Sequence, residues 1–333
     1  MSHRRLPDSE QTFYADRVMA SRYREEPCRT ALNRVTGMSF NWSLNPYTGC
    51  AHRCTFCFVR AFEARADRPW DDRYGQSIRV KTNVATVLAR ELARPRWTRE
   101  LVAVGTATDP YQPAEGRFRL TRRCIEALGA ARTPIHLITR GPLIVRDIDV
   151  LADAARRAPV SITISVPTID RELWRRTEPG TAPPEQRLRA LARLVAAGLD
   201  VGVGMAPILP GLSDRPESLA AVVRAARDAG ATGIWANLLY LRPGTREHFL
   251  DNLGRDWPAL LPHYERLYAG RAYLGRAEIG PIRRQVAELA RRFGVADRRL
   301  TRLEPGPEAE AAIPVQLALP LAAGETAGYA AGS

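Results

Sequence analysis

From residue 100 to residue 241 the chain alternates between short apolar runs and stretches in which apolar residues recur every three or four positions. Short apolar runs are typical of strands buried on both faces, and the wider spacing predicts amphipathic helices. An earlier strand is expected because Phe40, Trp42 and Leu44 alternate with polar residues. The predicted strands are 38–48, 101–105, 135–139, 160–166, 201–209 and 234–241. The predicted helices are 83–95, a segment around 124–128, 145–157, 184–197 and 216–230.

Strands that alternate with helices predict a parallel sheet, because each crossover returns the chain to the same edge. We therefore expect an α/β fold, a partial (β/α)6 TIM-like barrel that is curved open and not fully closed. Chemistry in such barrels collects at the carboxyl ends of the strands. The residues expected at that edge are the Cys50–Cys57 loop, Asp109, Arg140, Ser165 and Pro207.

Changes in composition divide the 333 residues into four predicted regions. Residues 1–37 are polar and rich in Arg without a regular period, and we interpret them as an N-terminal arm or short helices. Residues 38–245 form the barrel, 246–300 a C-terminal helical extension, and 301–333 a flexible tail rich in Ala, Pro and Gly that we expect to be disordered. No apolar run reaches the roughly 18 residues of a membrane helix, and no secretory signal is recognisable, so we expect a cytoplasmic protein.

Three closely spaced thiols, Cys50, Cys54 and Cys57, are the most informative group in the chain. Four cysteine thiolates normally hold a four-iron cluster, so three leave one iron open to bind a small molecule. A structural zinc site is the alternative, but it needs four protein ligands and usually a second Cys pair. No second pair exists, and His52, which could be a fourth ligand, is crowded between Cys50 and Cys54.

The spacing Cys-x3-Cys-x2-Cys with Phe56 before the last Cys resembles the radical S-adenosylmethionine (SAM) superfamily. More narrowly, the segment Asn45 to Cys57 followed by Thr106 to Glu115 resembles the branch grouped with spore photoproduct lyase, often called DNA repair photolyase-like. The resemblance runs from about Phe40 to Arg242. It implies a [4Fe-4S] cluster, SAM as second cofactor, an external electron donor of flavodoxin or ferredoxin type, and a hydrogen-abstracting 5′-deoxyadenosyl radical.

The resemblance also implies particular contacts with SAM. Thr108 and Asp109 are expected at the methionine end, Arg140 at the carboxylate, and Ser165 at the ribose or the carboxylate. The alternative for each is a residue at a strand end that only caps a helix.

Two positions depart from spore photoproduct lyase. That enzyme has a hydrogen-donating cysteine where this chain has Thr106, and tyrosines where this chain has Phe56 and Phe58. Neither threonine nor phenylalanine is a useful hydrogen donor, which argues against spore photoproduct as the substrate. Cys124 is expected to be a buried and inert thiol, since its neighbours are apolar.

The net charge of +13 and the pI near 10.2 favour a polyanionic partner, so nucleic acid is the first substrate class that we consider. A radical SAM enzyme that acts on a peptide or small metabolite is one alternative. A non-catalytic iron-sulfur or zinc module that binds nucleic acid is another, and it would never cleave SAM.

The tail contains a separate candidate motif. Gln316 to Leu321 resembles the short Gln-Leu-x-Leu-Pro-Leu peptides by which bacterial proteins bind the DNA sliding clamp, and it follows the Pro-Gly segment 304–307. The alternative is a low-complexity Ala-Leu-Pro tail, because short motifs often occur by chance.

Overall fold

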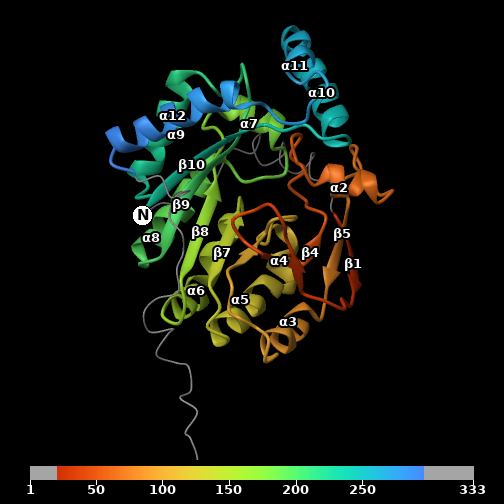
Figure 1. The fold of residues 1–333 in the computed structure, drawn as a ribbon, viewed down its shortest axis with the longest axis vertical. Coiled ribbons are helices and arrows are strands. Elements are labelled where there is room, and N and C mark those ends of the chain that lie inside the picture. The colour runs from red at the N-terminus through yellow and green to blue at the C-terminus, as the bar shows by residue number, and fades with distance from the viewer. Residues whose placement is uncertain (1–20, 296–333) are drawn as a thin grey trace, which may run out of the picture. The chain divides into compact units, whose positions relative to one another are not determined.

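The computed structural model describes residues 21–295. A curved sheet of seven strands has the order β10-β9-β8-β7-β6-β3-β2, and all of its neighbours are parallel except β2 and β3 (Figure 1). Its strands are β2 (Leu32–Arg34), β3 (Trp42–Leu44), β6 (Val102–Val104), β7 (Ile135–Thr139), β8 (Val160–Ser165), β9 (Asp200–Ile208) and β10 (Gly233–Leu238).

The six predicted strands are confirmed as a parallel array, and the α/β partial barrel is confirmed with them. The interior strands are apolar runs as expected: every residue of β6 and of β8 is buried. One boundary was wrong. The segment 38–48 supplies β3 and also β4 (Tyr47–Thr48), which leaves this sheet and joins a second one. Asn45 and Pro46 separate the two strands, and proline ends a regular strand.

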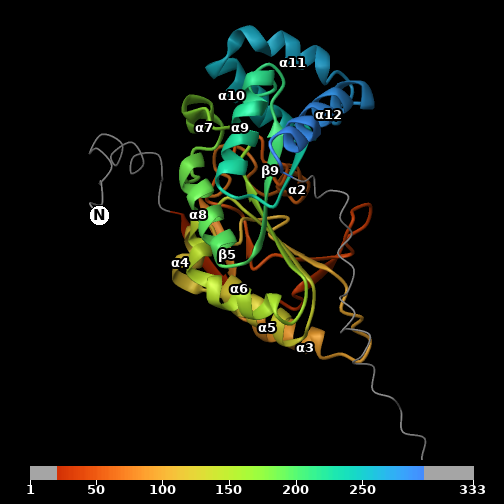
Figure 2. The same cartoon turned by 90° about the vertical axis from the view of Figure 1, so that its left-hand side faces the viewer.

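The predicted helices between the strands are confirmed. They are α3 (Val84–Leu92), α5 (Leu120–Ala130), α6 (Ile148–Ala155), α8 (Pro184–Ala196) and α9 (Pro216–Asp228), with the 3-10 helix η1 (Pro142–Asp147) before α6. In Figure 2, α3, α5, α6 and α8 follow one another along one side of the sheet, where α3 packs on α5 and α5 on α6. Their buried faces and the strands form one continuous apolar core.

Several short elements were not predicted. They are α2 (Arg60–Arg65), α4 (Pro113–Phe118) and α7 (Arg171–Thr177). The helix α10 (Thr245–Asp256) falls in the predicted C-terminal extension. The C-terminal extension is helical as expected, with η2 (Pro258–Leu260), α11 (Leu261–Leu267) and α12 (Arg276–Arg292). In Figure 1 the strands β7 and β8 point toward the end of the molecule where α7 and α10 lie.

The described part of the N-terminal arm consists of strands and not of short helices. β1 (Arg22–Glu26) pairs in parallel with β5 (Ser77–Lys81), which also pairs with β4. The sequence pattern did not predict β1, because its residues are mostly polar and only two of them are partly buried, so no apolar period results. The side chain of Asn83, at the N-cap position of α3, makes no capping hydrogen bond; it accepts from the Cys28 amide (2.7 Å) and donates to the Cys28 carbonyl (3.1 Å), which fixes this segment.

Residues 1–20 and 296–333, which include the predicted tail and its Gln316–Leu321 motif, lie outside the described residues. Among the helices between residues 21 and 295, none has the length and apolar character required to cross a membrane. The division of the chain at residues 245 and 300 stays a prediction; α10 begins at Thr245, one residue before the predicted extension.

Candidate active site

The three predicted cluster cysteines lie in one loop between β4 and α2. Cys50 and Cys54 are buried and Cys57 is partly buried, with its Sγ 3.9 Å from the Tyr74 hydroxyl. Burial raises the pKa of Cys50 well above its usual value and that of Cys54 to about 12. As free thiols, Cys50 and Cys54 are therefore neutral at physiological pH.

Two glycines allow the surrounding chain to approach this loop closely. A Cβ on Gly75 would lie 2.3 Å from the main-chain oxygen of Cys50, and one on Gly180 would lie 2.3 Å from that of Ala51. The Gly180 amide donates to the His52 carbonyl (3.0 Å), and the Thr55 amide donates to the Thr177 carbonyl (2.9 Å). The loop is thus fixed by main-chain contacts on both sides.

The two halves of the sequence motif, one at Asn45–Gly49 and one at Thr106–Glu115, bind each other. The Asn45 side chain donates to Thr106 Oγ1 (3.3 Å) and accepts from the Ala107 amide (2.8 Å). Thr108 Oγ1 donates to the Gly49 carbonyl (2.6 Å). At the far end, the buried hydroxyl of Tyr47 donates to the carboxylate of Glu115. The second half of the motif therefore holds the first in place.

Gln112 extends this contact to the cysteines themselves. Its side chain donates to the Gly49 carbonyl (3.1 Å) and accepts from the Ala51 amide (3.0 Å). It is therefore hydrogen-bonded to the main chain on both sides of Cys50. It is completely buried. The sequence motif contained this residue, but nothing in the sequence showed that its partner was the cysteine loop.

Asp109 is buried at the end of β6 and all its hydrogen bonds are to protein groups. One oxygen accepts from the Tyr111 amide (2.8 Å) and Thr139 Oγ1 (2.6 Å), and the other accepts from the Arg140 amide (2.7 Å). His52 Nδ1 lies 3.3 Å from the second oxygen. Burial opposes ionisation, but the His52 contact and these donors lower the pKa of Asp109 to about 2. Both residues expected at the methionine end, Thr108 and Asp109, thus support the loop in this structure.

Arg140 lies beside the cysteine loop, as predicted. Its guanidinium is 5.5 Å from the centre of the Phe56 ring, and it contributes a positive potential at Cys54. Nε donates to Glu178 Oε2 (3.0 Å) and Nη2 to the Ala206 carbonyl (2.9 Å). Nη1 has no partner within residues 21–295, so one edge of this guanidinium remains available to a ligand.

Glu178 and Arg187 complete a buried charge cluster that the sequence did not reveal. The side chains of both are fully buried, and Arg187 Nη1 lies 2.8 Å from Glu178 Oε2, the same oxygen that Arg140 contacts. Glu178 Oε1 is buried without a hydrogen-bond partner in the described structure. An unpaired buried carboxylate oxygen is costly, which indicates a missing partner.

Ser165, the fourth predicted SAM contact, ends β8 and is buried. Its carbonyl accepts from Arg187 Nη1 (3.0 Å), which links it to Glu178 and through Glu178 to Arg140. The structure therefore joins Arg140 and Ser165 through one charge network, whereas Thr108 and Asp109 contact the loop directly. Cys124 lies apart from this network in the apolar core, where burial raises its pKa, as expected for an inert thiol.

The thiols suit a cluster better than a single metal ion. Within residues 21–295 no three His, Cys, Asp or Glu side chains come close enough together to hold one ion, as a zinc site requires. In a four-iron cluster the thiolates bind separate irons and stand further apart. Arg140 and Arg187 place positive charge near Cys54, which favours a negatively charged thiolate there, and Glu178 offsets part of this effect. The residues present fit a [4Fe-4S] cluster.

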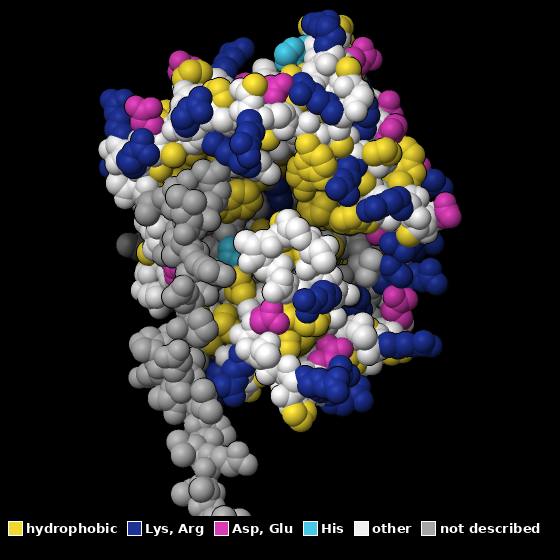
Figure 3. All heavy atoms as spheres, viewed as in Figure 1, with side chains coloured by type: hydrophobic (Ala, Val, Ile, Leu, Met, Phe, Trp, Pro, Cys, Tyr) yellow, Lys and Arg dark blue, Asp and Glu magenta, His cyan; other side chains and the backbone are white. Residues whose placement is uncertain are grey.

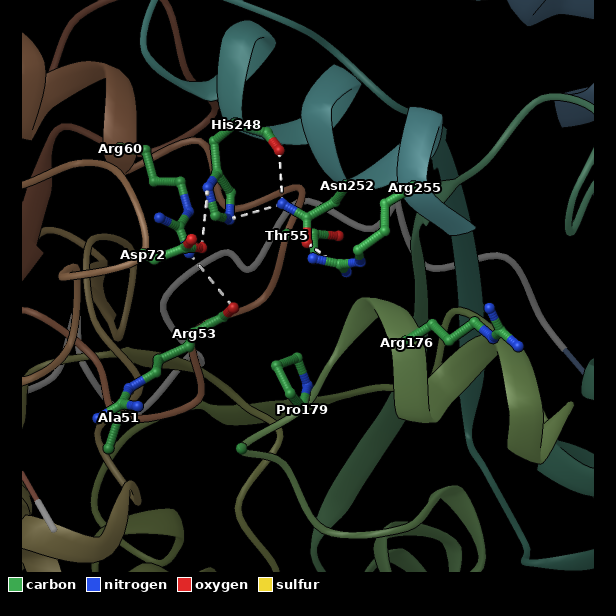
Figure 4. Close-up of a pocket in the computed structure, with 11 residues that line it drawn as sticks. Ala51, Arg53, Thr55, Arg60, Asp72, Arg176, Pro179, His248, Asn252 and Arg255 are labelled. Carbon is green, nitrogen blue, oxygen red and sulfur yellow. Dashed lines mark hydrogen bonds and ion pairs between the residues drawn. The ribbon is translucent and has the colours of Figure 1, made fainter. Parts of the chain in front are cut away.

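A cavity of about 190 Å³ lies next to the cysteine loop (Figure 4). Its lining includes residues between the cysteines and three from α10; the full set is Ala51, Arg53, Thr55, Arg60, Asp72, Arg176, Pro179, Gly180, His248, Asn252 and Arg255. Its arginines have protein partners: Arg255 contacts Asp256 (2.8 Å), and Arg60 donates to four main-chain carbonyls. The cavity is thus lined by residues that flank Cys50 and Cys54, and none of the predicted site residues is among them.

Comparisons with known proteins agree with this geometry. The sequence profile of the radical SAM superfamily matches residues 44–223. An uncharacterized protein of Mycobacterium tuberculosis is 41% identical over 302 residues, which cover 89% of this chain and 88% of the relative. An uncharacterized protein of Acidianus two-tailed virus is 27% identical and covers 65% of this chain and 72% of its own length.

A solved structure of spore photoproduct lyase with bound AdoMet and dinucleoside spore photoproduct has a similar fold. The TM-score is 0.63 at 15% sequence identity, and the match covers 88% of this chain and 85% of that chain. The superfamily profile matches more than half of the chain, including the cysteine loop and the strand ends that support it. This chain belongs to the radical SAM superfamily, whose enzymes use a [4Fe-4S] cluster and SAM.

Proposed function

We propose that Cys50, Cys54 and Cys57 hold the [4Fe-4S] cluster of this radical SAM enzyme. The observation that supports this most strongly is the position of the loop, fixed at the carboxyl ends of the parallel strands with Arg140 beside Cys54. When bound and reduced, the cluster supplies the electron that cleaves SAM to a 5′-deoxyadenosyl radical, which abstracts a hydrogen atom from the substrate. The thiol loop places this chemistry at the mouth of the barrel.

Arg140 and Glu178 are the side chains that we assign to the two charged ends of the methionine part of SAM. Arg140 Nη1 is a donor without a partner in the described structure and suits the carboxylate. Glu178 Oε1 is a buried acceptor without a partner and suits the amino group. Ser165 lies at the same strand edge and stays the candidate for the ribose. Thr108 and Asp109 act, in this proposal, through the loop that they support.

Nucleic acid is the substrate class that we propose. The net charge of +13 and the motif shared with the DNA repair photolyase-like branch support it. The similar fold of spore photoproduct lyase, solved with a dinucleoside photoproduct, is consistent with it. Thr106, whose hydroxyl accepts from Asn45, replaces the donor cysteine of that enzyme, so the reaction differs in how the product radical receives its hydrogen. A peptide or small metabolite is the competing substrate class.

The test uses full-length protein reconstituted with iron and sulfide without oxygen. We expect close to four irons per chain, and 5′-deoxyadenosine when SAM and a reductant are added. Replacing Cys50, Cys54 and Cys57 together with alanine should abolish both, while Cys124→Ala should leave both unchanged. Iron binding without SAM cleavage in the parent protein would favour the non-catalytic iron-sulfur module.

Two partners complete the proposal. Radical SAM enzymes require an electron donor, and the resemblance to this superfamily implies one of flavodoxin or ferredoxin type. The free thiols of the described chain suit a reducing, cytoplasmic setting. The sliding clamp is the second partner, through Gln316–Leu321. A peptide spanning 313–323 should bind the host clamp with micromolar affinity, and Gln316→Ala with Leu319→Ala should abolish binding. A flat titration with the parent peptide would exclude this partner.

A further inference from the structure

Four aromatic rings form a continuous row that passes beside the last cysteine of the loop. Phe62 of α2 contacts Phe58, which follows Cys57 directly, and Phe58 contacts Tyr240 at the end of β10; the ring centres are 5.8 Å apart in both pairs. Tyr240 stacks on Tyr273, which lies between α11 and α12, with centres 5.3 Å apart and planes 22° apart. The row therefore joins three separate parts of the chain beside Cys57.

Both ends of this row are exposed. Phe62 is 37% exposed and Tyr273 is 51% exposed, two of the three exposed large hydrophobic side chains in the described structure. On the face drawn in Figure 3, hydrophobic side chains mixed with Lys and Arg gather at the upper right, in the area where Figure 1 draws α2. Exposed hydrophobic surface bordered by polar side chains is a feature of binding sites when it is contiguous.

An arginine lies close to each exposed ring. The Arg65 guanidinium lies 4.9 Å from the centre of the Phe62 ring, and that of Arg242 lies 5.3 Å from the centre of the Tyr273 ring. Within residues 21–295 neither arginine is paired with a carboxylate, whereas Arg122 and Arg146 each contact Asp147. Two unpaired cations on aromatic faces suit a ligand that carries both negative charge and a flat ring.

We infer that the row formed by Phe62, Phe58, Tyr240 and Tyr273 binds a nucleobase by stacking, while Arg65 and Arg242 contact the flanking phosphates. This rests on the proposed nucleic-acid substrate and specifies its state. Bases in a duplex already stack on each other, so the ring faces of this row are accessible only to a single-stranded or extruded nucleotide. Because Phe58 follows Cys57 directly, a base stacked on this row would lie beside the proposed cluster loop.

The test measures the affinity of the reconstituted full-length protein for a single-stranded oligothymidine and for a duplex containing it, at fixed salt. Stacking of one base on an aromatic side chain contributes roughly 1–3 kcal/mol, so Tyr273→Ala should weaken single-strand binding by about 5- to 150-fold. Tyr273→Phe keeps the ring and should bind like the parent. Phe62→Ala, on a different element, should also weaken binding, and Met38→Ala, exposed but outside the row, should not.

A second measurement separates charge from stacking. Arg242→Gln should reduce the slope of log affinity against log salt concentration by about one, because one contact with a phosphate is lost. If the parent protein binds neither single strand nor duplex at low salt, the proposed nucleic-acid substrate fails and the inference fails with it. If the parent binds but Tyr273→Ala and Phe62→Ala both bind within twofold of it, only the role of the row is refuted.

Discussion

At the scale of single residues, a substitution at Asp109 distinguishes a structural role of this carboxylate from a direct contact with the cofactor. It accepts hydrogen bonds from Tyr111, Thr139 and Arg140 and lies next to His52, so Asp109→Asn would place an amide group opposite donors. We expect the free energy of unfolding of the cluster-free protein to fall by about 2–4 kcal/mol. Chemical denaturation followed by circular dichroism measures this.

The control for Asp109 is Asp153→Asn, which removes exposed ion pairs with Arg156 and Arg157 and should cost at most about 1 kcal/mol. A stable Asp109→Asn protein that loses only SAM affinity would show instead the direct cofactor contact expected from the sequence. The sequence alone could not decide between the two roles, because a strand-end carboxylate suits either one and two of its donors, Thr139 and Arg140, are 30 or more positions away.

At the scale of elements, the cysteine loop depends on the close approach of Gly75. Gly75 has a φ of 79° and Gly198 a φ of 81°, so alanine is strained at both, by roughly 1–2 kcal/mol. Only at Gly75 would the new Cβ also collide with the loop, 2.3 Å from the Cys50 oxygen; at Gly198 no atom lies within 4 Å. Gly75→Ala should therefore lower both the stability and the iron retained per chain, and Gly198→Ala the stability alone.

Unfolding free energy and iron content after gel filtration measure the two effects of these glycine variants. Equal iron content in both variants would contradict the view that main-chain packing fixes the loop. The strands and helices of the barrel were predictable because their apolar periods are long and regular. Gly75, Gly180 and strand β1 were not, since their roles come from partners distant in sequence.

At the scale of the whole molecule, the order of the strands decides which side chains meet. The parallel array β3-β6-β7-β8 brings the cysteine loop, Asp109, Arg140 and Ser165 to one edge, which the sequence pattern predicted. The charge cluster of Glu178 and Arg187 and the aromatic row were missed, because contacts between side chains of different elements leave no period in the sequence. The sequence therefore predicted which strand ends carry the candidate site. The side-chain contacts around that site became visible only in the structure.

The central claim is that three thiolates leave one iron of the cluster open to SAM. Mössbauer spectroscopy of the reconstituted full-length protein, recorded with and without SAM, tests it most directly. About one quarter of the iron should change its signal when SAM is added, since only the iron without a cysteine ligand binds it. Iron that responds uniformly, or not at all, would contradict the account.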